Sequence, residues 1–110
     1  LGHLADLQAE GLISHLALTN FDTANLGRIV AAGIRVISNQ VQYSLIDRRP
    51  EREQLAFCRE HHIRFLTYGT LCGGLLSERF LGQPEPSPGM LETSSLKKYK
   101  RMIDSWGNWN

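Results

Sequence analysis

Hydrophobic and polar residues follow two different periods along this chain. Three short apolar runs, continuous or rich in β-branched residues, have the pattern of buried strands. We expect strands at residues 16–18, 34–37 and 63–68. Elsewhere apolar residues recur three or four positions apart, which is the spacing of one helix face. We expect helices over residues 1–10, 22–32, 50–60 and 94–106.

Residues at the helix ends support these bounds. Asp22 or Thr23 can cap the second helix, and Gly33 follows its last turn. Ser94 or Ser95 can cap the last helix. The apolar face of that last helix is expected to comprise Leu96, Tyr99, Met102 and Ile103.

The order of these elements predicts the fold class. A helix ends and a strand begins around Leu12, again around Ile34 and again around Ile63. Such repetition predicts an α/β protein of about three β/α units, with parallel strands joined by right-handed crossovers. The last third departs from this pattern, because three prolines fall between residues 83 and 89. We expect a Pro-rich loop over 83–93 within one partial domain that spans 1–110.

The amino-acid composition argues against two classes of binding partner, nucleic acids and membranes. Of the 110 residues, 12 are Lys or Arg and 11 are Asp or Glu, so the net charge is +1. This balance gives no electrostatic footprint for nucleic acid, and no apolar run approaches the ~20 residues of a membrane helix. We therefore expect neither nucleic acid nor a membrane as partner. Two cysteines are too few for a disulfide scaffold, which favours a reducing compartment and a cytoplasmic protein.

Polar residues and glycines gather where the three predicted strands end. They are Thr19-Asn20, Ser38-Asn39-Gln40 and Tyr68 with the loop 69–74. Parallel α/β folds bind ligands at this edge. Amides and hydroxyls there can bind a carboxamide or a ribose, an aromatic ring can stack on a heterocycle, and glycines let backbone N–H groups approach a pyrophosphate. The same residue types also turn a chain after a strand, so spacing alone leaves both interpretations open.

Other chemical motifs are weaker. The 69–74 loop matches neither the Walker motif nor the G-x-G-x-x-G fingerprint. The four histidines and two cysteines lack the spacing of a zinc site, so we expect no metal. Cys58 near His61 fits a small buried hydrophobe better than a nucleophile. The basic cluster at residues 97–101 fits a solvated helix face better than a phosphate site.

Three segments at these strand ends resemble one family, the aldo-keto reductases. Residues 17–22 resemble the family's Ser-Asn-Phe segment after its fifth strand, and 38–45 resemble its Asn-Gln-x-x-Tyr segment after the sixth. Residues 67–76 are similar to its Tyr/Trp-Ser-Pro-Leu-x-x-Gly-Leu-Leu segment after the seventh. The three occur in the family's order, and the resemblance covers residues 1 to about 82.

The resemblance implies a partial (β/α)8 TIM barrel and an NADP(H)-dependent reduction of a small-molecule carbonyl by hydride transfer. Thr19 (in place of Ser), Asn20 and Gln40 would hold the nicotinamide carboxamide, and Tyr68 would stack on the nicotinamide ring. The backbone that would line the pyrophosphate comprises Gly69, Thr70, Leu71 and Gly73. Gly69 and Thr70 replace the family's usual Ser-Pro.

The family's catalytic Tyr, Lys, Asp and His belong to its first four strands, which no segment here matches. We therefore expect no catalytic residue in this chain and no carbonyl reduction by the 110-residue chain alone. At ~31 residues per unit of a roughly 250-residue barrel, the chain holds about three and a half units.

Two other hypotheses differ in kind. The first is a non-catalytic truncated module that binds a nucleotide or a partner, with self-association through its open sheet edges. The second is a small complete α/β domain, which three strands without a fourth argue against.

Overall fold

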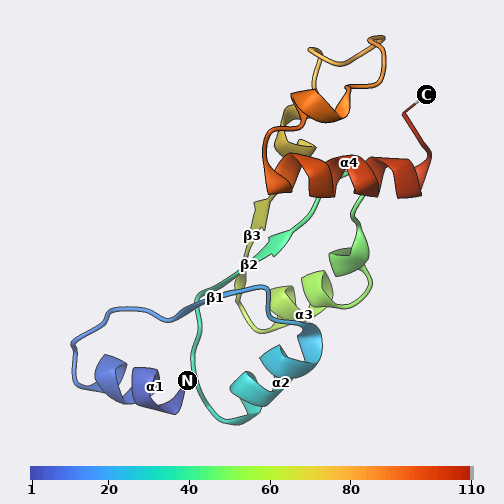
Figure 1. Cartoon of the computed structure of the whole chain (residues 1–110). Coiled ribbons are helices and arrows are strands. Elements are labelled where there is room, and N and C mark those ends of the chain that lie inside the picture. The colour runs from blue at the N-terminus through green and yellow to red at the C-terminus, as the bar shows by residue number, and fades with distance from the viewer. Residues whose placement is uncertain (110) are drawn as a thin grey trace. The chain divides into compact units, whose positions relative to one another are not determined.

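The computed structural model describes residues 1–109 (Figure 1). It contains four α-helices, namely α1 (Gly2–Ala9), α2 (Thr23–Ala31), α3 (Gln54–Glu60) and α4 (Ser94–Trp106). Its strands are β1 (Ala17–Thr19), β2 (Ser38–Gln42) and β3 (Arg64–Tyr68). Short 3-10 turns are η1 (Arg49–Glu51), η2 (Cys72–Gly74) and η3 (Pro88–Met90).

The chain divides into two compact units. Residues 1–42 and 49–68 form the first, which we call the strand unit, and residues 43–48 with those from 69 onward form the second, which we call the C-terminal unit. Each is described by itself below.

A parallel three-stranded sheet with β2 in the middle organises the strand unit. The register sets Thr19 beside Gln40 and Gln40 beside Leu66. The parallel order confirms the α/β prediction, and it brings the carboxyl ends of all three strands to one edge.

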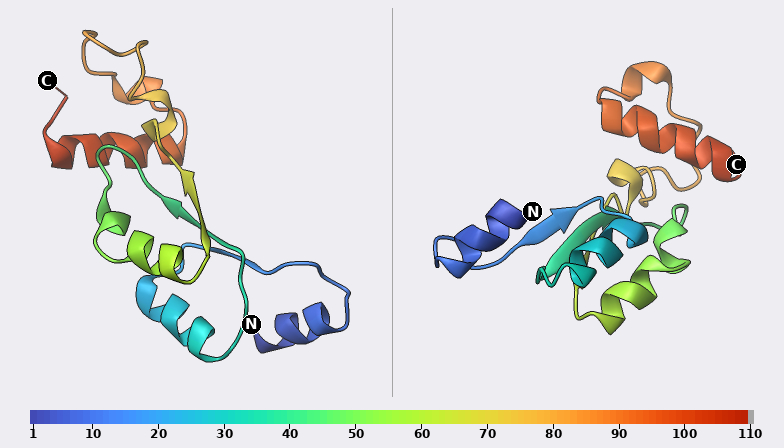
Figure 2. Two further views of the ribbon diagram at one scale, coloured as in Figure 1. Left: turned by 180° about the vertical axis from the view of Figure 1, so that it is seen from behind. Right: turned by 90° about the horizontal axis from the view of Figure 1, so that it is seen from below.

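One face of this sheet is covered by helices and the other is open. Helices α2 and α3 lie on the same side of the strands (Figure 2). They bury a core made of Leu16, Leu18, Leu26, Ile29, Val36, Cys58 and Ile63. The side chains of Thr19, Gln40 and Leu66 are exposed on the opposite side, which we call the open face.

The second strand lies later in the sequence than predicted. Residues 34–37 are irregular, and β2 covers Ser38–Gln42, so the prediction of a strand at 34–37 is wrong. The β-branched run still packs, because Val36 is buried and Ile37 donates its N–H to the Leu16 carbonyl at 2.8 Å. The strand ladder begins at Ser38, opposite Ala17 and Arg64.

Helix boundaries follow the predicted caps in one case and differ in two. The Asp22 carboxylate accepts the Asn25 N–H at 2.8 Å and caps α2, as predicted. The cap of α4 is Thr93, whose hydroxyl accepts the Leu96 N–H at 3.1 Å, so neither Ser94 nor Ser95 has this role. The third helix begins only at Gln54, because the prolyl turn η1 precedes it.

The C-terminal unit packs α4 against the 69–76 loop. Its core consists of Cys72, Leu75, Leu91, Tyr99 and Ile103, with Leu96 and Met102 packed partly against it. The predicted apolar face of the last helix is therefore confirmed. The segment 83–93 contains η3.

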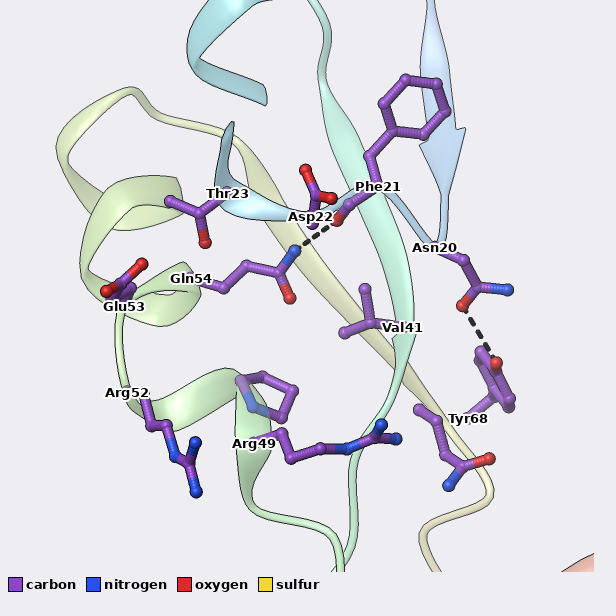
Figure 3. A pocket seen from close by; sticks show the side chains of 12 residues that line it. Asn20, Phe21, Asp22, Thr23, Val41, Arg49, Arg52, Glu53, Gln54 and Tyr68 are labelled. Atoms are coloured by element: carbon purple, nitrogen blue, oxygen red, sulfur yellow. Dashed lines mark hydrogen bonds between the residues drawn. The ribbon is translucent and has the colours of Figure 1, made fainter. Parts of the chain in front are cut away.

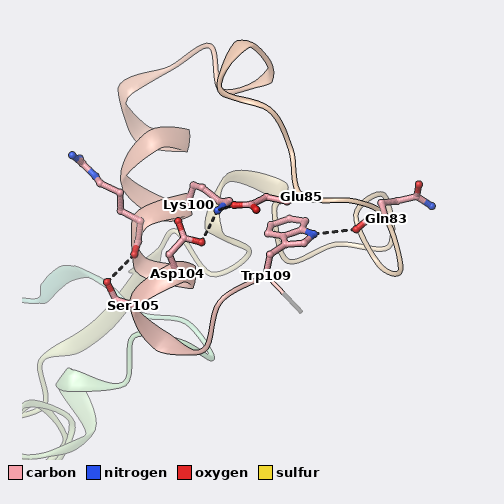
Figure 4. Close-up of polar contacts among 7 residues, drawn as sticks. Gln83, Glu85, Lys100, Asp104, Ser105 and Trp109 are labelled. Atoms are coloured by element: carbon pink, nitrogen blue, oxygen red, sulfur yellow. Dashed lines mark hydrogen bonds and ion pairs between the residues drawn. The ribbon is translucent and has the colours of Figure 1, made fainter.

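Lys100 of α4 links this segment to the helix. Its ammonium group pairs with the carboxylates of Glu85 and Asp104 (Figure 4). The indole Nε1 of Trp109 donates to the Gln83 carbonyl at 3.0 Å. The segment is thus attached to α4 through Lys100 and to Trp109, which follows the helix.

The first helix differs from the others because it buries no residue. Its residues Leu4 and Leu7, and Leu1 just before it, are exposed. None of the described helices is long and apolar enough to cross a membrane.

Candidate functional site

Asn20 stands directly after β1, at the carboxyl edge of the sheet. Its backbone is left-handed, with φ +60°, a conformation that asparagine tolerates better than other side chains. The Asn20 N–H donates to the Gln40 carbonyl of β2 at 2.8 Å, which fixes this turn.

The Asn20 side chain reaches across to the last residue of β3. The Tyr68 hydroxyl donates a hydrogen bond to Asn20 Oδ1 at 2.9 Å (Figure 3). The ends of the two outer strands are therefore joined by side chains, although β2 separates those strands. Asn20 is exposed and Tyr68 is half-buried, so a ligand can reach the pair.

Thr19 and Gln40 stand next to this pair. They are register neighbours on the open face, and both are exposed. Thus the structure brings four of the predicted residues, Thr19, Asn20, Gln40 and Tyr68, to one part of the strand unit. A hydroxyl, two amides and a phenol at one sheet edge can satisfy a polar planar group that has both donors and acceptors.

Asn39 supports the site from the other side of the sheet. It is fully buried, its Nδ2 donates to the Phe21 carbonyl at 2.9 Å, and its Oδ1 accepts the Phe21 N–H at 3.4 Å. Gln54 at the start of α3 donates from Nε2 to the same Phe21 carbonyl. The residue after Asn20 is thereby tied to β2 and α3.

These supporting roles were not predicted from the sequence. The sequence pattern groups Asn39 with Gln40 as strand-end polar residues and gives no signal at Gln54. Because β2 includes residues 39–42, alternation sends Asn39 to the helix side together with Val41, and Gln40 to the open face. Correct placement of the strand would have revealed this division.

A cavity of about 660 Å³ lies at this end of the strand unit. Asn20 and Tyr68 stand at one wall and Gln54 at another, with Val41 between them (Figure 3). The remaining lining residues are Phe21, Asp22, Thr23, Gln42, Arg49, Pro50, Arg52 and Glu53. The cavity is therefore mostly polar and carries side chains of both charges.

The other predicted residues, Gly69, Thr70, Leu71 and Gly73, belong to the C-terminal unit. Gly69 has φ +67°, and a Cβ there would come within 2.9 Å of Tyr99 Cζ. Gly73 has φ +68°, and a Cβ there would come within 2.9 Å of Leu96 Cδ2. Packing against the Tyr99 ring thus favours glycine at position 69, whereas at position 73 the Leu96 methyl group can shift and the left-handed backbone is what favours glycine.

Both cysteines have the character of buried hydrophobes. Burial raises the pKa of the Cys58 thiol, and this side chain is only 1% exposed. Burial is also the main cause that raises the pKa of Cys72, with Asp47 adding to the rise and Ser44 and Lys98 opposing it. Protonated thiols are poor nucleophiles, which agrees with the structural role predicted for Cys58.

Parallel β/α units with polar groups at the carboxyl edge define the class of α/β proteins that bind their ligands at that edge. Residues 1–109 match the model of the Aldo/keto reductase family, and the chain belongs to this family. Membership makes the three strands part of a (β/α)8 barrel, as the sequence predicted.

Two curated proteins are similar to this chain. Flagellar radial spoke protein 5 of Chlamydomonas reinhardtii is 29% identical over 99 residues, which are 88% of this chain and 19% of that protein. The uncharacterized oxidoreductase YqkF of Bacillus subtilis (strain 168) is 33% identical over 82 residues, which are 74% of this chain and 26% of that protein. The chain thus spans about a fifth to a quarter of these relatives. The family and the second relative support an oxidoreductase-type function.

Proposed function

We propose that this chain supplies the cofactor-facing segments of an NADP(H)-dependent oxidoreductase, which reduces a small-molecule carbonyl to an alcohol by hydride transfer. The observation that carries the proposal is the group formed by the Asn20–Tyr68 hydrogen bond and its neighbours Thr19 and Gln40, at the carboxyl edge of the sheet. NADP(H), when bound, supplies the hydride. The residues of this chain hold and orient the cofactor.

The chemistry of the group fits the nicotinamide end of the cofactor. A carboxamide has two N–H donors and one acceptor oxygen. Thr19, Asn20 and Gln40 together offer donors and acceptors for each of these. The Tyr68 ring, at the end of β3, offers an aromatic face for the nicotinamide ring.

The pyrophosphate is assigned to the backbone of the C-terminal unit. Gly69, Thr70, Leu71 and Gly73 offer N–H groups, which are suited to phosphate oxygens. The neighbouring N–H groups of Cys72 and Gly74 already donate to the carbonyls of Gly69 and Leu71. These bonds hold the loop in shape.

The same proposal includes a cytoplasmic location. Cys58 and Cys72 are both buried and free, which fits a reducing compartment.

The test is a titration of the purified 110-residue chain with NADPH, followed by nicotinamide fluorescence. We expect saturable binding, and we expect Tyr68→Ala to weaken it because the stacking face and the Asn20 partner are both lost. Tyr43→Ala is the control, since Tyr43 belongs to the C-terminal unit and is not among the residues proposed to hold the cofactor. An unchanged dissociation constant in Tyr68→Ala would remove Tyr68 from the site.

A second candidate function is a non-catalytic component of an assembly. The similarity to a flagellar radial spoke protein favours it. The same titration separates the two candidate functions, because a purely structural component needs no NADPH site. Saturable binding supports the oxidoreductase, and absence of binding by a folded chain supports the assembly component.

A further inference from the structure

Asn20 is held by hydrogen bonds from two neighbouring strands, which fix both its position and the orientation of its side-chain amide. Its backbone N–H is bound by Gln40 of β2, and its side-chain oxygen is bound by the Tyr68 hydroxyl of β3. The next residue, Phe21, is clamped by the buried Asn39 amide. The loop is therefore held by hydrogen bonds at the Asn20 backbone, at the Asn20 side chain and at the backbone of the next residue.

The hydrogen bond from Tyr68 distinguishes the two ends of the Asn20 amide. Oδ1 faces the hydroxyl, and Figure 3 shows Nδ2 turned away from it. Within residues 1–109, the Asn20 amide hydrogen-bonds through Oδ1 and has no protein acceptor at Nδ2. The hydroxyl of Thr19 can donate or accept, and the amide of Gln40 can turn either end toward a ligand. Asn20 is thus the member of the group whose amide has a definite orientation in the structure, with Oδ1 on the Tyr68 hydroxyl.

We propose that the Tyr68 hydroxyl is a positioning group that fixes this polarity, so that Asn20 Nδ2 donates to the carbonyl oxygen of the cofactor's carboxamide. The inference rests on the proposed function and gives Tyr68 a second role, separate from stacking. The ring provides the aromatic face, and the hydroxyl orients Asn20. Phenylalanine at this position would keep the first role and lose the second.

The first test compares Tyr68→Phe with Tyr43→Phe, which removes the same hydroxyl from a half-buried tyrosine outside the cavity. We expect Tyr68→Phe to weaken NADPH binding by about three- to tenfold, the range for one hydrogen bond. Binding of adenosine 2′,5′-bisphosphate, which lacks the nicotinamide, is expected to stay unchanged. Equal NADPH affinity in wild type and Tyr68→Phe overturns the proposal.

The second test identifies the atom to which Asn20 donates. The 3-acetylpyridine analogue of NADPH keeps the carbonyl oxygen and replaces the NH₂ group by a methyl group. If Nδ2 donates to that oxygen, Tyr68→Phe weakens NADPH and the analogue by the same factor. If Asn20 instead accepts from the NH₂ group, the penalty vanishes with the analogue, and the assigned polarity is wrong.

A third measurement needs no cofactor and keeps the two proposals apart. We expect the ¹H–¹⁵N side-chain amide resonances of Asn20 to shift in free Tyr68→Phe and to stay in place in Tyr43→Phe. The remaining backbone resonances report whether each variant is folded. Unchanged Asn20 resonances overturn the positioning role, whereas a wild-type chain that does not bind NADPH contradicts the proposed function.

Discussion

Asn39 shows how a single buried amide can organise a site that it does not touch. Its side chain is fully enclosed, and a polar group in such a place is tolerated only when it is hydrogen-bonded. Both ends of the amide are bonded to the backbone of Phe21, so Asn39 acts as the pairing partner for a chain segment that has left the sheet.

Removal of this amide is expected to destabilise the strand unit. Asn39→Ala leaves the Phe21 N–H without its partner and is expected to lower the free energy of unfolding by about 1–3 kcal/mol, the cost of an unpaired buried group. Urea unfolding followed by circular dichroism measures it. Asn25→Ala, at an exposed position of α2, is the matched control and is expected to change stability by less than about 0.5 kcal/mol. Equal effects of both substitutions would contradict the role assigned to Asn39.

The residues of the candidate site were predictable from the sequence in part. Thr19, Asn20, Gln40 and Tyr68 stand out in the sequence as polar residues near the ends of predicted strands, the family resemblance gave them their roles, and the fold brings them to one part of the strand unit. The Asn20–Tyr68 bond was not predictable, because it depends on a left-handed residue and on a contact across an intervening strand. The roles of these residues toward a cofactor stay predictions.

At the scale of elements, local pattern predicted the kind of each segment better than its bounds. The parallel α/β order and the apolar face of α4 were predictable from periodicity, whereas the leucines of α1 have the same spacing and are exposed. The β-branched residues predict the second strand at 34–37, but the regular pairing of this strand with β1 and β3 begins only at Ser38. The α4 cap was missed by one residue, because Thr93 rather than Ser94 has the extended backbone that a cap requires.

The junction of α4 with the glycine loop gives a prediction that separates backbone strain from packing. Gly69→Ala and Gly74→Ala both place a side chain on a left-handed residue. This strain is expected to lower the free energy of unfolding by about 1–2 kcal/mol in each variant. Only Gly69→Ala also meets the Tyr99 ring, which adds about 1–3 kcal/mol of overpacking. A Cβ at Gly74 has open space within 4 Å. Urea unfolding followed by tryptophan fluorescence reports on the C-terminal unit, which holds both tryptophans, and equal losses in the two variants would rule out the packing argument.

At the scale of the whole molecule, the open face of the sheet is the dominant feature. In a (β/α)8 barrel the sheet face opposite the helices points to the barrel interior and is packed in layers. In the 110-residue chain this face exposes Leu66 beside Thr19 and Gln40, and the leucines of α1 are exposed as well. Exposed apolar faces and open strand edges favour association between chains.

We therefore expect the purified 110-residue chain to self-associate as its concentration rises, measured by sedimentation velocity. Leu66→Lys places a charge on the open face and is expected to shift the chain toward the monomer. Leu12→Lys, at an exposed position outside the sheet, is expected to leave the distribution unchanged. A wild-type chain that stays monomeric across the series contradicts this expectation.

The pairing of Lys100 with Glu85 and Asp104 has a consequence for how the 83–93 segment responds to acidity. Burial lowers the pKa of the Lys100 ammonium, but the two carboxylates outweigh it and hold that pKa above the usual value of 10.5. A lysine whose pKa is raised in the folded chain contributes its full stabilisation at pH values below the pKa of the unfolded chain. This contribution is lost only as the pH rises through the raised pKa of the folded chain. The lysine charge that holds the segment is therefore constant throughout the neutral range, and alkali is the condition that removes it.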